Sequence, residues 1–159
     1  MKNLQFKQLL LLSDTQKKAN QFLFQKRFNL ITADDNSVGK STLAKLLLWT
    51  FGCEPDFDST WKSTDCKCLV DFSIDGTNYK ILRYQNFISL KEENKEILNY
   101  TNIGGDYSKK FAELVDFKVL LPKRGSDETE LVTPPPAYYF LPFYMDQKNS
   151  YSFICFFKH

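Results

Sequence analysis

The segment 34–42 holds the side chains best suited to chemistry. Gly39, Lys40, Ser41 and Thr42 follow one another at the start of a stretch with helical periodicity. The first turn of a helix has unpaired backbone N–H groups and a partial positive charge, so it attracts anions such as phosphate. Gly39 would let the backbone approach a phosphate closely, and Lys40 would reach the β- and γ-phosphates. The Ser41 hydroxyl would bind magnesium, and Thr42 would contact the α-phosphate.

The complete phosphate-loop pattern has a glycine five residues before Gly39, and this chain has Asp34 there. Aspartate tolerates the left-handed backbone better than most residues, so the turn can form without that glycine. Between these two positions, Asn36, Ser37 and Val38 would turn their backbone N–H groups inward and form a cradle for anions. We therefore predict a site for ATP and magnesium at this loop. The alternative is a chance Gly-Lys-Ser sequence at the start of a helix.

A phosphate loop needs a buried strand before it and an amphipathic helix after it, and both are predicted. Phe28–Thr32 is mostly apolar and is expected to be a buried strand. Lys40–Phe51 has apolar residues at helical spacing, and Gly52 is expected to end that helix in the left-handed conformation. Upstream, Leu4–Leu12 and Asn20–Phe24 are predicted as two strands joined by a polar turn.

A second block of strands is predicted after the helix. Asp75-Gly76 is a typical hairpin turn, and it lies between the alternating segments Cys68–Ile74 and Tyr79–Tyr84. Three further elements are expected: a hairpin of Phe87–Leu90 with Glu96–Leu98, an amphipathic helix over Tyr107–Val115, and a buried strand within the aromatic segment Ala137–Met145.

Composition narrows the class of protein. The chain has 159 residues, of which 43% are hydrophobic and 25% charged, and this suits one globular domain. A net charge of +2 gives no electrostatic case for nucleic acid, although Lys17, Lys18, Lys26 and Arg27 form a small basic group. No cleavable signal pattern is visible, and no apolar stretch reaches the roughly 18 residues of a membrane span. A cytoplasmic protein is therefore expected.

Metal binding through cysteine is not expected. Cys66 and Cys68 would point the same way on a strand. A zinc site would need two further ligands at suitable spacing, and the only histidine is His159. Reduced thiols are the expected state of the four cysteines.

The segment Phe28–Leu48 resembles the ATPase head of the structural-maintenance-of-chromosomes (SMC) family and its DNA-repair relatives, a branch of the ABC-type ATPases. The loop of that branch typically reads Gly-x-Asn-Gly-x-Gly-Lys-Ser. This chain has Asp34 and Ser37 where the family has glycine. The order of predicted elements is also similar over most of residues 1–150. The loop positions that match the family are Asn36, Gly39, Lys40 and Ser41.

The resemblance implies an α/β fold, namely the N-terminal lobe of a P-loop NTPase, with a mixed sheet, a loop-helix phosphate site and a small antiparallel subsheet. It implies ATP and magnesium as cofactors. It also implies a glutamine that contacts magnesium and the attacking water, for which Gln147 is the candidate; a surface glutamine is the alternative. The implied partners are a second ATPase lobe, or a homologous head that dimerises on ATP, and DNA through the full assembly. The implied setting is DNA repair or anti-phage defence.

The catalytic site of such an ATPase is completed by a second lobe. That lobe carries a Leu-Ser-Gly-Gly-type signature, an acidic magnesium motif, a catalytic glutamate and a switch histidine, and none of these is visible in the sequence. Residues 1–150 are therefore expected to be an ATP-binding lobe that hydrolyses poorly alone, and 151–159 an atypical tail that indicates truncation. The alternatives are a non-catalytic interaction module that pairs with a full-length ATPase head, and a small nucleotide kinase.

Overall fold

A six-stranded antiparallel sheet forms the body of the protein. The computed structural model describes residues 2–32, 34–35, 39–123, 125 and 130–140. The strand order is β2-β1-β3-β4-β5-β6, and each neighbouring pair in the sheet is antiparallel. The strands are β1 (Leu4–Ser13), β2 (Lys18–Leu23), β3 (Cys66–Ile74), β4 (Thr77–Tyr84), β5 (Phe87–Glu92) and β6 (Ile97–Tyr100).

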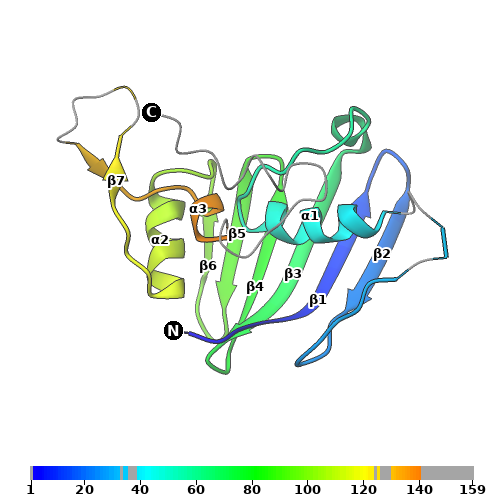
Figure 1. Cartoon of the computed structure of the whole chain (residues 1–159), viewed down its shortest axis with the longest axis horizontal. Coiled ribbons are helices and arrows are strands. Elements are labelled where there is room, and N and C mark those ends of the chain that lie inside the picture. Colours follow the sequence, from blue (N-terminus) through cyan, green and yellow to red (C-terminus); the bar gives the residue numbers. More distant parts are fainter. Residues whose placement is uncertain (1, 33, 36–38, 124, 126–129, 141–159) are drawn as a thin grey trace.

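Two helices accompany the sheet. Helix α1 (Lys40–Thr50) crosses one face of the strands, and α2 (Asp106–Val115) lies beside β6 (Figure 1). The smaller elements are the 3-10 turn η1 (Trp61–Thr64), the short helix α3 (Ala137–Phe140), and a separate two-stranded ladder of β7 (Leu121–Pro122) with β8 (Leu131–Val132). No helix in the described ranges is long and apolar enough to cross a membrane.

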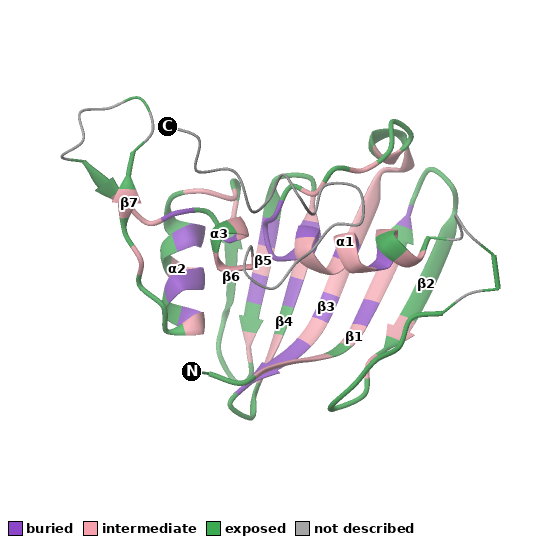
Figure 2. Ribbon diagram, in the orientation of Figure 1, coloured by how far each residue is buried: buried purple, intermediate pink, exposed green. Residues whose placement is uncertain are grey.

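The alternation of side chains in β3 explains why one sheet face is covered. Cys68, Val70 and Phe72 point to the helices and are at most 1% exposed. Residues one position out of phase, such as Leu69 and Leu82, pair across the other face and stay half-buried. A strand period of two sends neighbouring residues to opposite faces. Figure 2 shows the buried positions as bands across the strands under α1.

Phe51, directly after α1, is the centre of the core. Its ring meets Phe72 of β3 edge-on, with ring centroids 4.9 Å apart, and Phe111 of α2 at 6.2 Å. Phe6 of β1 and Phe140 of α3 complete the cluster at 5.7 and 5.8 Å. Edge-to-face pairs of this kind contribute about 0.5–1.5 kcal/mol each beyond the burial of their area. One aromatic residue thus joins both helices and α3 to the sheet.

Most of the predicted elements are confirmed. Strands β1 and β2 match the first predicted hairpin, and α1 begins at Lys40 as expected. The turn at Asp75-Gly76 has positive φ at both residues, which suits the twist of a two-residue hairpin. The hairpin of β5 with β6 and the helix α2 also lie where the sequence placed them.

The predicted buried strand at Phe28–Thr32 is wrong. This segment forms no strand, and Phe28 and Leu30 are 91% and 88% exposed. The physical reason is that the segment has no pairing partner within the described residues, because it joins neither of the sheet's two free edges, at β2 and β6. Apolar composition alone cannot make a strand without a neighbour to receive its hydrogen bonds.

The predicted buried strand at Ala137–Met145 is wrong over its described part. Ala137–Phe140 is one helical turn, in which the N–H groups of Tyr138 and Tyr139 donate to the carbonyls of Pro135 and Pro136. Prolines pre-set the backbone for a first helical turn, and this outweighs the strand preference of the aromatic residues. Residues 141–145 lie outside the described chain. The assignment to a P-loop NTPase lobe with a mixed sheet stays a prediction.

Gly52 ends α1 in the left-handed conformation, as predicted, with φ +97°. Its N–H donates to the Trp49 carbonyl at 2.9 Å, and the Cys53 N–H reaches the Leu48 carbonyl at 3.1 Å. This pair of bonds is a Schellman motif. A Cβ on Gly52 would lie 2.9 Å from a methyl group of Ile103 and 3.0 Å from the Tyr107 ring.

Gly52→Ala is therefore expected to destabilise the fold by about 2–4 kcal/mol, the sum of left-handed strain and overpacking. Urea unfolding followed by circular dichroism measures it. Gly76→Ala is the matched control, because Gly76 has a similar φ of +89° but nothing within 4 Å of its Cβ position. Equal losses for the two variants would show that packing around Gly52 contributes nothing.

Candidate nucleotide-binding site

Helix α1 begins directly after a glycine in the left-handed conformation. Gly39 has φ 90° and ψ 12°, which is left-handed, and its carbonyl accepts the first helical hydrogen bond from Leu43 at 3.0 Å. A Cβ at Gly39 would meet nothing within 4 Å. The requirement for glycine is therefore conformational, and the described chain leaves this end of the helix open.

The polar side chains of the motif gather at this end. The Lys40 amine donates to the Asp35 carbonyl at 2.7 Å. Ser41 is exposed and Thr42 is half-buried. Because the first-turn N–H groups have no acceptor within the helix, they add to the positive potential of the Lys40 amine. Backbone donors, an ammonium group and a hydroxyl together fit a phosphate with its magnesium ion.

Part of the predicted site lies outside the described residues. Asn36, Ser37 and Val38 of the loop are not described, and neither is Gln147. Asp34, which takes the place of the family's glycine, is described and exposed. The roles of these residues in ATP and magnesium binding stay predictions.

The C-terminal end of α1 is fixed by Arg83 of β4, which was not among the predicted functional residues. Arg83 is 1% exposed and lies against Trp49, with the guanidinium carbon 4.3 Å from the ring centroid. Its Nη1 donates to the carbonyls of Trp49 and, at 2.9 Å, of Cys53. Its Nε donates to the Gln85 carbonyl at 2.8 Å, and its Nη2 pairs with Glu54.

These contacts give the Trp49 carbonyl a second donor beside the Gly52 N–H, and they give the Cys53 carbonyl a donor. The last carbonyls of a helix have no intrahelical donor and carry a partial negative charge, so a buried cation there is favourable. Tyr107 of α2 adds a hydrogen bond from its hydroxyl to the Phe51 carbonyl at 2.9 Å. The helix end is therefore bonded to both β4 and α2.

Burial also sets the acidity of groups around this end of α1. Burial lowers the pKa of Arg83, and the neighbouring Glu54 carboxylate opposes that change. Burial raises the pKa of the Cys53 thiol to about 12, and likewise that of Cys68 to about 12. Both thiols are therefore protonated at neutral pH. No group of three His, Cys, Asp or Glu residues that could hold a metal ion occurs within the part of the chain that is described.

A signal for Arg83 was present in the sequence. Ile81 and Arg83 are two residues apart on β4, and both face the helices. A charged residue in the core-facing phase of an alternating strand must find buried partners, because an unpaired buried charge is very unfavourable. A charged residue at a core-facing position of an alternating strand is therefore a sequence signal of a buried structural role.

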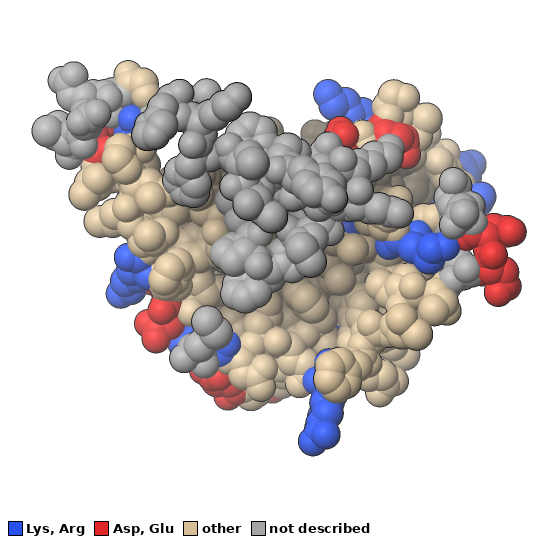
Figure 3. Space-filling view, in the orientation of Figure 1, with Lys and Arg blue, Asp and Glu red and all other residues tan. Residues whose placement is uncertain are grey.

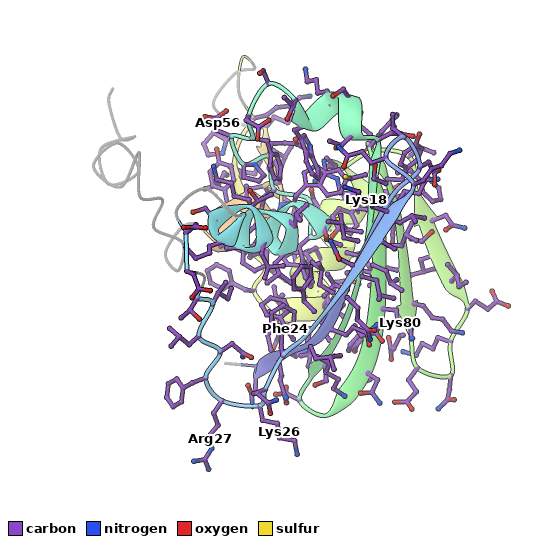
Figure 4. All side chains as sticks on the ribbon, turned by 90° about the vertical axis from the view of Figure 1, so that its right-hand side faces the viewer. Lys18, Phe24, Lys26, Arg27, Asp56 and Lys80 are labelled. Atoms are coloured by element: carbon purple, nitrogen blue, oxygen red, sulfur yellow. The ribbon has the colours of Figure 1, made fainter. Side chains whose placement is uncertain are left out.

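The four basic residues that the sequence grouped together lie in two separate places in the structure. Lys18 begins β2, whereas Lys26 and Arg27 follow the other end of that strand (Figure 4). Six residues of strand span about 20 Å, so these cations do not form one patch. DNA contact remains a prediction that concerns a larger assembly.

Comparisons with known proteins give a distant match. No family model matches the chain. It is similar to the Lamassu protein LmuB of Bacillus cereus (strain VD014), with 24% identity over 152 residues, covering 96% of this chain and 26% of that protein. It is also similar to a Lamassu protein LmuB of another Bacillus species, with 26% identity over 136 residues, covering 85% of this chain and 23% of that protein. The chain thus spans about a quarter of the length of these curated relatives.

Arg83→Met is expected to destabilise the fold by about 1–3 kcal/mol, because it removes the donor to the buried Cys53 carbonyl and one of the two donors to the Trp49 carbonyl. Glu54→Gln should cost less than about 1 kcal/mol, since the Glu54 side chain is 67% exposed and its ion pair is screened by water. Chemical denaturation of both variants, with the exposed Lys109→Met of α2 as a control, measures the difference. Equal losses for Arg83→Met and Lys109→Met would contradict the role of Arg83.

Proposed function

We propose that the chain is the ATP-binding lobe of an SMC-like ATPase that acts in anti-phage defence. In this proposal the N-terminal end of α1 holds the triphosphate. Gly39 supplies the turn, Lys40 contacts the β- and γ-phosphates, Ser41 binds magnesium and Thr42 contacts the α-phosphate. The observation that carries the proposal is the left-handed Gly39 directly before Lys40 and Ser41 at the open end of a helix.

The similarity to two Lamassu LmuB proteins supports the setting in anti-phage defence over one in DNA repair. Each match extends over more than four fifths of this chain, so it includes strands and helices well beyond the loop. The activity of the longer relatives is part of the proposal for this chain, since it spans only about a quarter of their length.

The exposed segment before the loop supports a second lobe as partner. Phe28, Leu30 and Ile31 are 91%, 88% and 40% exposed, although they lead directly into the loop at Asp34. Burying side chains of this size contributes about 1.5–3 kcal/mol each. A strand of a second ATPase lobe paired with this segment would bury them and would place its own carboxylates near the phosphates. A non-catalytic module that pairs with a full-length ATPase head would use the same surface.

ATP binding is expected to depend on Lys40. Isothermal titration of the 159-residue chain with MgATP should give saturable binding. Lys40→Ala should weaken it at least about tenfold, because a charge-assisted hydrogen bond to phosphate is lost. Lys109→Ala, which removes an exposed cation of α2, is the matched control and should bind like the parent chain. Unchanged affinity in a folded Lys40→Ala variant would refute the assignment of the loop.

Hydrolysis by the chain alone is expected to be negligible. Phosphoryl transfer depends on several charged groups that act together, and the loop supplies only the ammonium and the hydroxyl. A phosphate-release assay on the purified chain, with Lys40→Ala as the background control, measures this. Robust turnover that disappears in Lys40→Ala would show that no second lobe is needed.

A further inference from the structure

A cavity lies at the end of α1 opposite the phosphate loop, and the proposed function does not use it. It has a volume of about 690 Å³ and lies between the segment 54–65 and the β4–β5 turn at Gln85 and Asn86. Gly39 and Trp49 are separated by ten residues of helix, or about 15 Å at 1.5 Å per residue. The cavity is therefore a distinct site.

Aromatic rings line this cavity. Phe57 and Trp61 are stacked on one another, with ring centroids 4.1 Å apart and planes 14° apart. Trp61 in turn meets Trp49 edge-on at 5.4 Å. Phe57 and Trp61 are only half-buried, so part of this stack remains accessible from the cavity. Aromatic faces attract cations, and the planar guanidinium in particular stacks on them.

Carboxylates surround the aromatic rings. Four acidic residues and the two cations Lys62 and Arg83 line the cavity, and a third cation, Lys45 of α1, acts on Asp58 from beside it. Arg83 is buried and is already paired with Glu54, so Lys62 is the cation that remains exposed. The whole chain has a net charge of +2, so this acidic region contrasts with the rest of the molecule. Figure 3 shows acidic atoms beside basic ones at the top of the view, over the segment that carries η1. The acidic residues are Glu54, Asp56, Asp58 and Asp65.

Hydrogen bonds hold the Asp58 carboxylate in place. Asp58 accepts hydrogen bonds from the backbone N–H of Thr60 at 2.8 Å and from the Thr60 hydroxyl. These bonds lower the pKa of Asp58, so its charge persists below the usual range of a carboxyl group. The Asp56 carbonyl accepts a hydrogen bond from the Lys45 amine of α1 at 2.5 Å, which ties this part of the segment to the helix. Asp56 is exposed and belongs to the cavity lining, in the upper part of the molecule (Figure 4).

We propose that this cavity binds an arginine side chain presented by a partner polypeptide, with the guanidinium on the Phe57–Trp61 stack and its N–H groups on Asp56 and Asp58. The fold already contains the same combination, because Arg83 lies over Trp49 and pairs with Glu54. Arginine suits the cavity better than lysine, since its planar fork can stack and donate to carboxylates together. An anionic ligand such as nucleic acid is disfavoured there.

The two tryptophans of the chain both line the cavity, so intrinsic fluorescence reports on it directly. Titration of the 159-residue chain with a hexaarginine peptide should give a saturable change in emission. Hexalysine should bind at least about threefold more weakly, because a lysine ammonium cannot stack as a plane. Equal affinities for the two peptides, or no saturable change, would overturn the proposal.

Substitutions of residues that line the cavity test whether hexaarginine binds there. Asp56→Asn together with Asp58→Asn should weaken hexaarginine about threefold to tenfold, because two partly exposed charge pairs are lost. Asparagine keeps the acceptor that Asp58 offers to Thr60, so the segment should stay folded. Asp106→Asn together with Glu113→Gln removes equal charge from α2 and should not change the affinity for hexaarginine.

Phe57→Leu should also weaken the binding of hexaarginine, while both tryptophan fluorophores remain. An equal effect of the α2 pair, or none from Phe57→Leu, would reduce the binding to general attraction and contradict the proposal.

Discussion

The buried guanidinium of Arg83 is the interaction on which the placement of α1 depends. A charge that is 1% exposed would be very unfavourable without partners, and a helix end without donors leaves its last carbonyls unsatisfied. The buried guanidinium and the helix end satisfy each other, because the guanidinium donates to the carbonyls of Trp49 and Cys53. The Trp49 ring and Glu54 complete its surroundings. Hydrophobic packing of Phe51 would hold α1 near the sheet, but these directional bonds fix which end lies over β4.

This arrangement leaves the two ends of α1 with different properties. The C-terminal end is bonded to β4 and α2, whereas the N-terminal end, with Gly39 and Ser41, faces solvent within the described chain. A helix of eleven residues is a stiff rod of about 16 Å, so fixing one end largely sets the direction of the other. The N–H groups proposed to hold phosphate are therefore positioned from a distance, by residues that touch no ligand.

Local signals in the sequence predicted local structure well. The Asp75-Gly76 turn, the period-two pattern of β3 and the helical spacing after Gly39 each depend on residues close together in the chain, and each is confirmed. The two wrong strand predictions have different causes. Phe28–Thr32 has the composition of a buried strand but lacks a neighbour, and Ala137–Phe140 follows prolines that favour a helical turn. Arg83 was missed for another reason. Its acceptors at the end of α1 are about thirty residues away, and no short sequence pattern contains both Arg83 and these acceptors.

One strand pairing, between β1 and β3, carries most of the entropy cost of bringing distant parts of the chain together in the sheet. Neighbours in the sheet are also neighbours in sequence, except that β1 pairs with β3 across the whole segment that carries the loop and α1. Ser13 and Cys66 face each other in that ladder. Local hairpins form quickly and long-range pairings slowly, so we expect the β1–β2 hairpin to dock last onto the β3–β6 meander. Since doubling the length of a closed segment costs only about 0.6 kcal/mol, insertions between β2 and β3 should be tolerated. The segment between β2 and α1 can therefore lengthen without loss of the sheet.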